Sequence, residues 1–151
     1  MNEQKVQRNM NVLIINGPNL NLLGMREPGI YGERSYQDLL RMISEKCSAL
    51  GMDCECFQSN HEGAIVDKIQ DAYGKFDGIV INPAAYTHTS IAILDALKAV
   101  RIPAVEVHIS NPDEREEFRH ISYAGMACVH SIKGHGLEGY LEAIEFLSHL
   151  E

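Results

Sequence analysis

Glu106 and His108 are the two polar side chains in the aliphatic run 104–109, which is typical of a buried strand. Alternate residues of a strand point to the same face, so these side chains should lie side by side. A carboxylate next to an imidazole favours the protonated ring, which a general acid needs at neutral pH. A structural ion pair is the alternative. Because an unpaired buried carboxylate is costly, the spacing favours His108 as an acid accompanied by Glu106.

A second candidate pair, Arg26 and Tyr31, lies in the segment 16–32, which has neither helical nor strand periodicity. Its length, glycines and apolar residues favour a lid. Pro28 and Gly29 suit the central positions of a type II turn that brings the pair together. Ionising a tyrosine at pH 7 takes about 4 kcal/mol, which one cation at about 4 Å supplies at an effective dielectric near 20. Arg26 could thus make Tyr31 a base. The alternative is an exposed arginine and a tyrosine that packs the loop down.

Neutral hydrogen-bonding side chains fill the segment 82–90, where a strand is predicted to end and a helix to begin. Such a junction directs side chains and free backbone N–H groups to one point, which suits a ligand with hydroxyl groups. The alternative is a capped helix with an exposed His88. The candidates are Asn82, Thr87, His88 and Ser90.

Arg115 and Arg119 lie one turn apart in the helix or turn expected after Asn111. Either could bind a carboxylate at the strand ends. The alternative, which we expect to hold for one of the two, is a surface charge paired with the neighbouring glutamates 114, 116 and 117.

Five short aliphatic runs alternate with segments of helical spacing, which predicts an α/β protein. The strands are expected at 12–15, 52–57, 78–81, 104–109 and 126–132. The helices are expected from Ser35, from about Glu62, from about Thr89, from Pro112 after the cap Asn111, and along 137–147. The first helix begins with a capping box of Ser35 and Asp38 and closes at Gly51. The alternation predicts a flavodoxin-like, doubly wound sheet of five parallel strands with helices on both faces, and a site beyond the carboxyl ends of the strands.

At 151 residues, 45% hydrophobic and 23% charged, the chain has the size and composition of one globular domain. We expect this domain at 11–151, preceded by a flexible tail at 1–10. The net charge of −8 and the lack of Lys or Arg runs argue against nucleic acid or an anionic membrane as a partner. No apolar run approaches the roughly 18 residues of a membrane span, and the N-terminus lacks the apolar core of a secretion signal. The cytoplasm is therefore the expected compartment.

The cysteines and histidines do not predict a metal site. Cysteines 47, 54, 56 and 128 match neither a zinc knuckle nor a CxxC redox motif, so free thiols are expected. Histidines 61, 88, 108 and 135 lack the spacing of a zinc signature, which argues against a metal hydrolase. The segment 16–32 contains neither a phosphate-loop motif nor GxGxxG.

Four segments together closely resemble the signature segments of type II 3-dehydroquinate dehydratases. They are residues 16–32 (NGPNLNLLGMREPGIYG), 59–63 (SNHEG), 82–90 (NPAAYTHTS) and 106–112 (EVHISNP). The resemblance covers residues 11–150, with the segments in the family's order and spacing. It implies a flavodoxin-like fold and the reversible removal of water from 3-dehydroquinate to give 3-dehydroshikimate.

By this resemblance, Tyr31 is the phenolate base that removes a proton from the carbon next to the ketone. Arg26 stabilises the tyrosinate and the developing enolate, and Asn19 holds a water or the enolate oxygen. His108, oriented by Glu106, protonates the departing hydroxyl. Elimination through an enolate requires no cofactor, whether metal, nicotinamide or Schiff-base lysine, and no lysine lies in the three candidate segments.

The resemblance also implies how substrate is bound and how the chain assembles. The matching substrate-binding positions are Asn82, His88, Ile109, Ser110 and Arg119. Asp95 matches a position that approaches the site from a neighbouring subunit of a homododecamer built from trimers. The chemistry serves aromatic amino acid biosynthesis through the shikimate pathway, or quinate breakdown. The alternative is a non-catalytic flavodoxin-like module that binds a small molecule in the same crevice.

Overall fold

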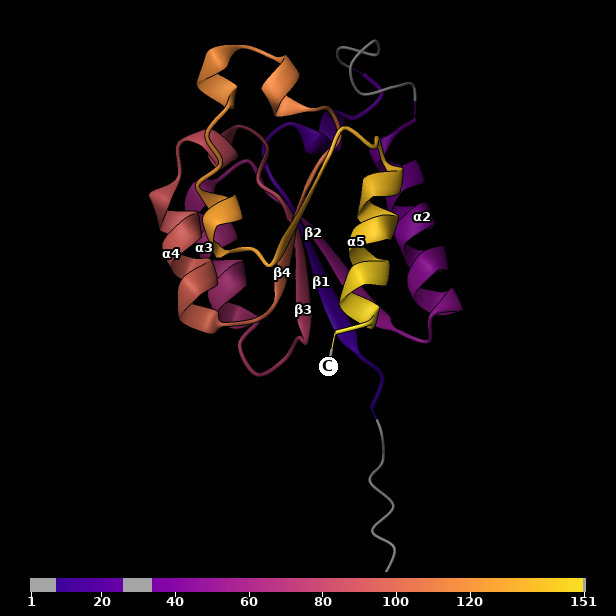
Figure 1. Cartoon of the computed structure of the whole chain (residues 1–151). Coiled ribbons are helices and arrows are strands. Elements are labelled where there is room, and N and C mark those ends of the chain that lie inside the picture. Colours follow the sequence, from indigo (N-terminus) through magenta and orange to yellow (C-terminus); the bar gives the residue numbers. More distant parts are fainter. Residues whose placement is uncertain (1–7, 26–33, 151) are drawn as a thin grey trace, which may run out of the picture.

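A computed structural model of the chain describes residues 8–25 and 34–150. Its centre is a five-stranded parallel sheet with the strand order β2-β1-β3-β4-β5 (Figure 1). This order is that of a flavodoxin-like doubly wound sheet and confirms the predicted fold class. The strands are β1 (Asn11–Asn16), β2 (Asp53–Gln58), β3 (Gly78–Asn82), β4 (Ala104–His108) and β5 (His130–Lys133).

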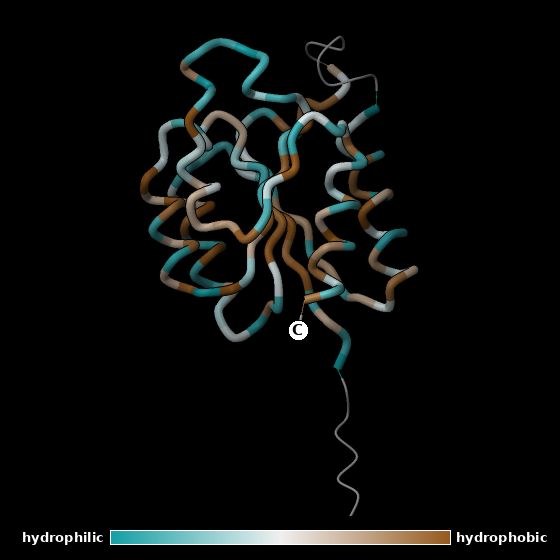
Figure 2. The backbone as a smooth tube through the Cα atoms, in the orientation of Figure 1, coloured by the Kyte–Doolittle hydropathy of each residue, from teal (hydrophilic) through white to brown (hydrophobic). Residues whose placement is uncertain are grey.

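Helices cover both faces of the sheet. One face packs against α2 (Tyr36–Ala49) and α5 (Glu138–Ser148), and the other against α3 (Glu62–Asp71) and α4 (Ile91–Val100) (Figure 1). Successive residues of β1 enter opposite cores, because side chains alternate along a strand. Figure 2 shows the hydrophobic strands in the middle of the molecule, with mixed hydropathy along the helices around them.

The helices begin where local sequence signals place them. Ser35 Oγ accepts the Asp38 N–H at 3.1 Å, and the Asp38 carboxylate accepts the Ser35 N–H at 2.8 Å, which confirms the predicted capping box. Helix α2 ends before Gly51, which takes a left-handed φ of 68°. Ser90 caps α4, which starts at Ile91, slightly later than expected. None of the helices in the described part of the chain is long and apolar enough to span a bilayer.

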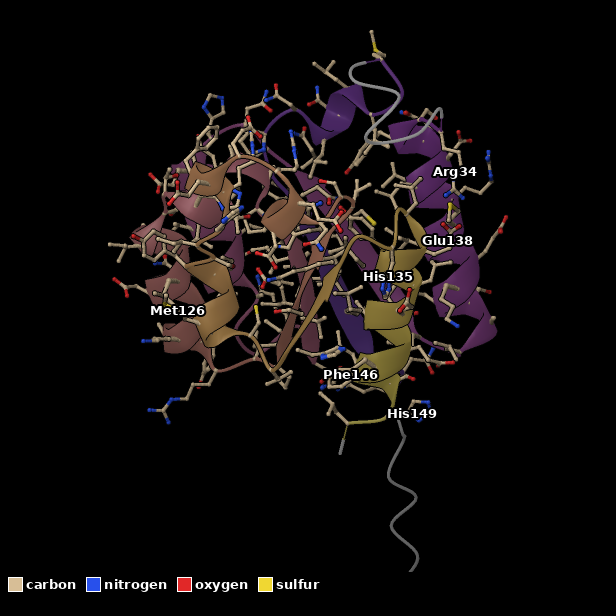
Figure 3. The ribbon with its side chains drawn as sticks, turned by 45° about the horizontal axis from the view of Figure 1, so that its top comes forward. Arg34, Met126, His135, Glu138, Phe146 and His149 are labelled. Atoms are coloured by element: carbon tan, nitrogen blue, oxygen red, sulfur yellow. The ribbon has the colours of Figure 1, made fainter. Side chains whose placement is uncertain are left out.

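Two bidentate ion pairs connect distant parts of the chain. Arg34, just before α2, contacts both carboxylate oxygens of Glu138 in the first turn of α5 at 2.8 Å (Figure 3). Arg8 contacts Asp77, just before β3, at 2.6 and 2.8 Å. Exposed pairs of this kind add little free energy to folding.

Between β4 and β5 a helix or turn was expected after Asn111, and the structure shows turns and no α-helix there. Residues 109–129, all of which the structure describes, instead contain three 3-10 turns: η3 (Pro112–Glu114), η4 (Glu117–Arg119) and η5 (Ala124–Ala127). Asn111 caps η3 by accepting the Asp113 N–H at 3.1 Å, but Arg115 returns to extended backbone. The residues after Pro112 carry no apolar stripe at helical spacing, so a longer helix would have no face to bury.

The last strand is shorter than expected, because β5 begins at His130 and not at Met126. Residues 124–127 form η5, which packs against α4 and buries Ala124 in the core beside that helix. Met126 points away from the molecule, with 63% of its surface exposed (Figure 3). The apolar residues here thus belong to a turn that covers α4, which their spacing alone does not distinguish from a strand.

Candidate active site

A pocket of about 190 Å³ opens beyond the carboxyl ends of β1, β3 and β4. This edge includes the point where the strand order reverses from β1 to β3, which is where doubly wound sheets bind ligands. Two turns, η1 (Leu20–Leu22) and η2 (Ala84–His88), contribute to its wall, together with η3 and η4. The lining residues are Pro18, Asn19, Leu20, Asn82, Ala84, Ala85, His88, His108, Ile109, Ser110, Pro112, Arg115 and Arg119.

Glu106 and His108 form a buried pair at the end of β4. His108 Nε2 lies 2.9 Å from Glu106 Oε2, and His108 lines the pocket while Glu106 lies behind it. Ser122 and Ser131 each donate a hydrogen bond of 2.6 Å to the same carboxylate. Burial raises the pKa of the Glu106 carboxyl, but the bonds from His108 and the two serines outweigh it and bring the pKa down to about 2. Glu106 is therefore ionised, and its hydrogen bond orients the His108 ring at the pocket.

His88 presents a hydrogen-bond acceptor to the pocket. Its Nδ1–H donates to the carbonyl of Ile121 at 2.7 Å. Burial, together with the nearby His108 and Arg119, lowers the pKa of His88, although the bond to Ile121 opposes this. A neutral ring whose Nδ1 carries the proton leaves Nε2 to accept from a ligand hydroxyl.

The amide of Asn82 is oriented from behind the pocket. Its Nδ2 donates to the Tyr140 hydroxyl at 2.9 Å, and that hydroxyl donates to Asn16 Oδ1 at 2.6 Å. Asn82 Oδ1 accepts the N–H of Ala84 at 3.1 Å. Asn16, Asn82 and Tyr140 are all buried, so the protein fixes the amide before any ligand binds. One N–H and one lone pair of Asn82 remain for the pocket.

Asn60, in the segment 59–63, forms hydrogen bonds with both loops that flank the pocket. Asn60 Oδ1 accepts the backbone N–H of Asn19 at 3.0 Å, and the carbonyl of Asn60 accepts the Tyr86 hydroxyl at 2.8 Å. Asn19 has a left-handed φ of 70°, a conformation that asparagine tolerates better than most residues. The turn at Asn19 is therefore stabilised by a residue that does not line the pocket.

Two arginines give one end of the pocket a positive charge. Arg115 and Arg119 both line it, and both approach Glu116 Oε1, at 3.8 and 3.0 Å. Pairing with a neighbouring glutamate and facing the pocket are thus compatible. Guanidinium groups suit carboxylates, so this end of the pocket fits an anionic ligand.

The chain matches the family described as dehydroquinase class II over residues 10–148. It belongs to this family. It is 58% identical over 140 residues to the 3-dehydroquinate dehydratase of Caldicellulosiruptor bescii, covering 92% of this chain and 97% of that protein. It is 54% identical over 139 residues to the enzyme of the same name from Clostridium perfringens, covering 91% and 96%.

Solved structures give the same relationship. The type II dehydroquinase from Butyrivibrio crossotus superposes with a TM-score of 0.91 at 58% identity, covering 92% of this chain and 97% of that one. A 3-dehydroquinate dehydratase-like protein from Bifidobacterium longum superposes with a TM-score of 0.70 at 30% identity, covering 93% and 96%. The dehydroquinase fold predicted from the motifs is therefore confirmed.

Most of the site residues expected from the sequence lie around one pocket. Glu106 lies behind His108 and does not line the pocket itself. The other residues of this set line the pocket directly. The lining members are Asn19, Asn82, His88, His108, Ile109, Ser110 and Arg119. Arg26, Tyr31 and the turn at 27–30 lie outside the described residues. Asp95 lies on the exposed face of α4 and does not line the pocket of its own chain.

Two of the hydrogen-bonding candidates in the segment 82–90 lie away from the pocket. Ser90 caps α4 by accepting the Ile93 N–H at 3.0 Å, and Thr87 is buried; neither lines the pocket. A helix-cap residue and a ligand-binding residue carry the same side chains at such a junction, so composition does not separate them.

Ser122 and Ser131 are not among the site residues expected from the sequence. Both bind Glu106 from segments that follow β4, and Ser131 is its neighbour on β5. A serine in an edge strand carries no distinct sequence signal. Within the described residues, no cluster of three or more His, Cys, Asp or Glu side chains is placed to hold a metal ion.

Proposed function

We propose that this chain is a type II 3-dehydroquinate dehydratase, which removes water from 3-dehydroquinate to give 3-dehydroshikimate in the shikimate pathway or in quinate breakdown. The observation that carries the proposal is the Glu106–His108 pair, 2.9 Å apart, at a pocket with an arginine-lined end, in a chain of the dehydroquinase family. A small cyclic hydroxy acid needs a cationic end for its carboxylate and neutral groups for its hydroxyls. The pocket offers both.

The proposed mechanism is an elimination through an enolate. Tyr31, ionised with the help of Arg26, takes a proton from the carbon next to the ketone, and Asn19 supports the enolate oxygen directly or through a water. His108 then donates its proton to the departing hydroxyl, which leaves as water. Since Nε2 of His108 binds Glu106, Nδ1 is the nitrogen that can act in the pocket. General acids of this kind typically contribute 10²- to 10⁴-fold.

Substrate binding follows from the lining residues. Arg119 takes the carboxylate, with Arg115 as a second cation at the same end. His88 accepts from a substrate hydroxyl. The remaining contacts come from the side chain of Asn82 and from Ile109 and Ser110.

The proposed assembly and location extend beyond a single chain. We propose that residues 11–151 form one catalytic domain, that the chain acts in the cytoplasm, and that it assembles as a homododecamer of trimers. In such an assembly Asp95 approaches the site of a neighbouring subunit. Its position on the outer face of α4 supports this role, because it is accessible to another chain.

The experiment follows the rise in ultraviolet absorbance as the conjugated enone forms from 3-dehydroquinate. We expect turnover that survives EDTA and borohydride treatment, and its loss in Tyr31→Phe with an unchanged circular dichroism spectrum. The matched control is Tyr73→Phe, because Tyr73 is 72% exposed and does not line the pocket. Near-normal kcat in Tyr31→Phe would remove tyrosine from the base role. Binding without any turnover in the parent protein would favour the non-catalytic module.

A further inference from the structure

Glu106 is held by three donors, only one of which belongs to the proposed catalytic pair. Oε2 accepts from His108 Nε2 at 2.9 Å and from Ser122 Oγ at 2.6 Å, and Oε1 accepts from Ser131 Oγ at 2.6 Å. Both carboxylate oxygens are thus fixed by hydroxyl groups, and only 2% of the residue is exposed. Hydrogen bonds to a carboxylate are strong because the acceptor is charged.

The two serines come from different elements. Ser131 on β5 is the register partner of Glu106 on β4, so its side chain lies on the same face of the sheet. Ser122 lies between η4 and η5 and is itself fixed, because its Oγ accepts the N–H of Gly125 at 2.9 Å. Neither serine lines the pocket.

The backbone at Gly125 closes tightly over the carboxylate. A Cβ at this position would lie 2.5 Å from Glu106 Oε1 and 2.8 Å from Ser122 Oγ. Such contacts are far below van der Waals distance, so the turn approaches Glu106 only because residue 125 is glycine. The turn η5 therefore serves as a cap on Glu106 in addition to covering α4.

The donor directions favour an ionised acceptor. Since Ser122 Oγ accepts from Gly125, its single hydroxyl hydrogen is directed to Glu106. We propose that Ser122 and Ser131 are positioning residues for the acid step, which hold the Glu106 carboxylate charged and aimed at His108. This inference rests on the proposed dehydratase function.

The other titratable groups near Glu106 do not supply a negative charge to His108. Among the described residues they are His108 on β4, His88 at the end of η2 and Cys128 after η5. Burial, with a smaller effect of Glu106, raises the pKa of the Cys128 thiol to about 12, so it stays neutral at working pH. Burial also lowers the pKa of His88. Glu106 is therefore the negative charge that faces His108.

The test compares the double variant Ser122→Ala/Ser131→Ala with the parent protein in the absorbance assay. The comparison covers the pH range in which the double variant and the parent both stay folded. Removal of the hydroxyl donors raises the pKa of Glu106. We expect kcat to fall roughly tenfold or more, KM to change less than about twofold because neither serine lines the pocket, and the acid limb of kcat to move to higher pH. Ser131→Thr, which keeps the hydroxyl on a strand, should restore most of the loss seen in Ser131→Ala.

The matched control is Ser148→Ala, which removes a serine hydroxyl bonded to Glu145 at the end of α5, away from the pocket. The kcat, the KM and the acid limb of Ser148→Ala should match those of the parent protein. If the double variant fails to fold, Ser131→Ala and Ser131→Thr decide the question, because Ser131 lies on an edge strand.

Two outcomes would overturn the inference. One is unchanged kcat with an unmoved acid limb in Ser131→Ala and in the double variant. The other is a rise in KM as large as the fall in kcat. This result would show that the serines determine the shape of the binding pocket and do not position Glu106 for the acid step. A parent protein without activity on 3-dehydroquinate would instead refute the proposed function itself, so the two failures are distinguishable.

Discussion

Glu106 keeps its charge inside an aliphatic strand because its environment replaces water. Desolvation of a carboxylate is costly, and here two hydroxyl groups and an imidazole supply the lost hydrogen bonds. The consequence at the level of the residue is a pKa of about 2, far below the ordinary value of 4.5. A group with so large a difference between the folded and unfolded states links stability to pH.

We predict that Glu106→Gln lowers the free energy of unfolding in a pH-dependent way. The pKa of Glu106 is lower in the folded chain than in the unfolded one, so its charge stabilises the fold above about pH 4.5, and this contribution is lost as pH falls toward about 2. The difference between parent and variant should be roughly 3 kcal/mol at neutral pH and should shrink below about pH 4.5.

Urea denaturation at a series of pH values measures this difference. Glu117→Gln is the control, because Glu117 is exposed and does not line the pocket. A constant difference between Glu106→Gln and the parent at all pH values would contradict the linkage.

At the scale of elements, the pocket depends on how closely the ends of two strands approach. Asn16 and Asn82 are register partners at the ends of β1 and β3, and the Gly17 N–H donates to the carbonyl of Asn82 at 2.8 Å. The next residues, Gly17 and Pro83, begin the loops that carry Asn19 and Ala84 into the pocket wall. The close approach of Gly17 to Pro83 therefore fixes how these two loops lie against each other beside the pocket.

We predict that Gly17→Ala destabilises the protein. A Cβ on Gly17 would lie 2.3 Å from the carbonyl oxygen of Pro83, which is backbone and cannot rotate away. The loops would have to separate, at a cost of about 1 to 3 kcal/mol or more, as in other overpacked sites. Thermal and urea denaturation measure the loss.

Gly63→Ala is the matched substitution for this prediction. Gly63 lies in α3, and a Cβ there meets nothing within 4 Å. Because alanine is a better helix former, this variant should be neutral or more stable by up to about 1 kcal/mol. Equal destabilisation by both substitutions would show that steric contact at Pro83 is not the cause.

At the scale of the whole molecule, the proposed role of Asp95 requires a second subunit. This residue lies on the exposed side of α4, away from the pocket residues of its own chain. In the proposed oligomer each site combines His108 of one subunit with Asp95 of its neighbour. Closed symmetric assemblies repeat such a contact at every interface.

We predict complementation between two inactive variants. Asp95→Asn and His108→Asn chains, co-expressed with different affinity tags, should form mixed oligomers in which about a quarter of the sites pair an intact His108 with an intact neighbouring Asp95. Turnover by the doubly purified oligomers should therefore exceed that of either variant alone. The controls are the separately expressed variants, mixed after assembly. Activity no higher than their mean would place the role of Asp95 within a single chain.

Local features of this protein were predictable from its sequence, because they depend on neighbours along the chain. Strand and helix periods, the Ser35 capping box and the shared face of Glu106 and His108 each involve residues a few positions apart. The dehydroquinase fold followed from the order of four such motifs. Where periodicity was ambiguous, as at 124–127, packing against α4 determined the turn.

The second layer of the site was decided by the tertiary structure alone. Ser122 and Ser131 reach Glu106 across 16 and 25 residues, and Tyr140 reaches Asn16 across 124. These contacts depend on strand register and on where a helix from the end of the chain packs. Both are set by burial of the whole core, for which no short stretch of sequence carries the information.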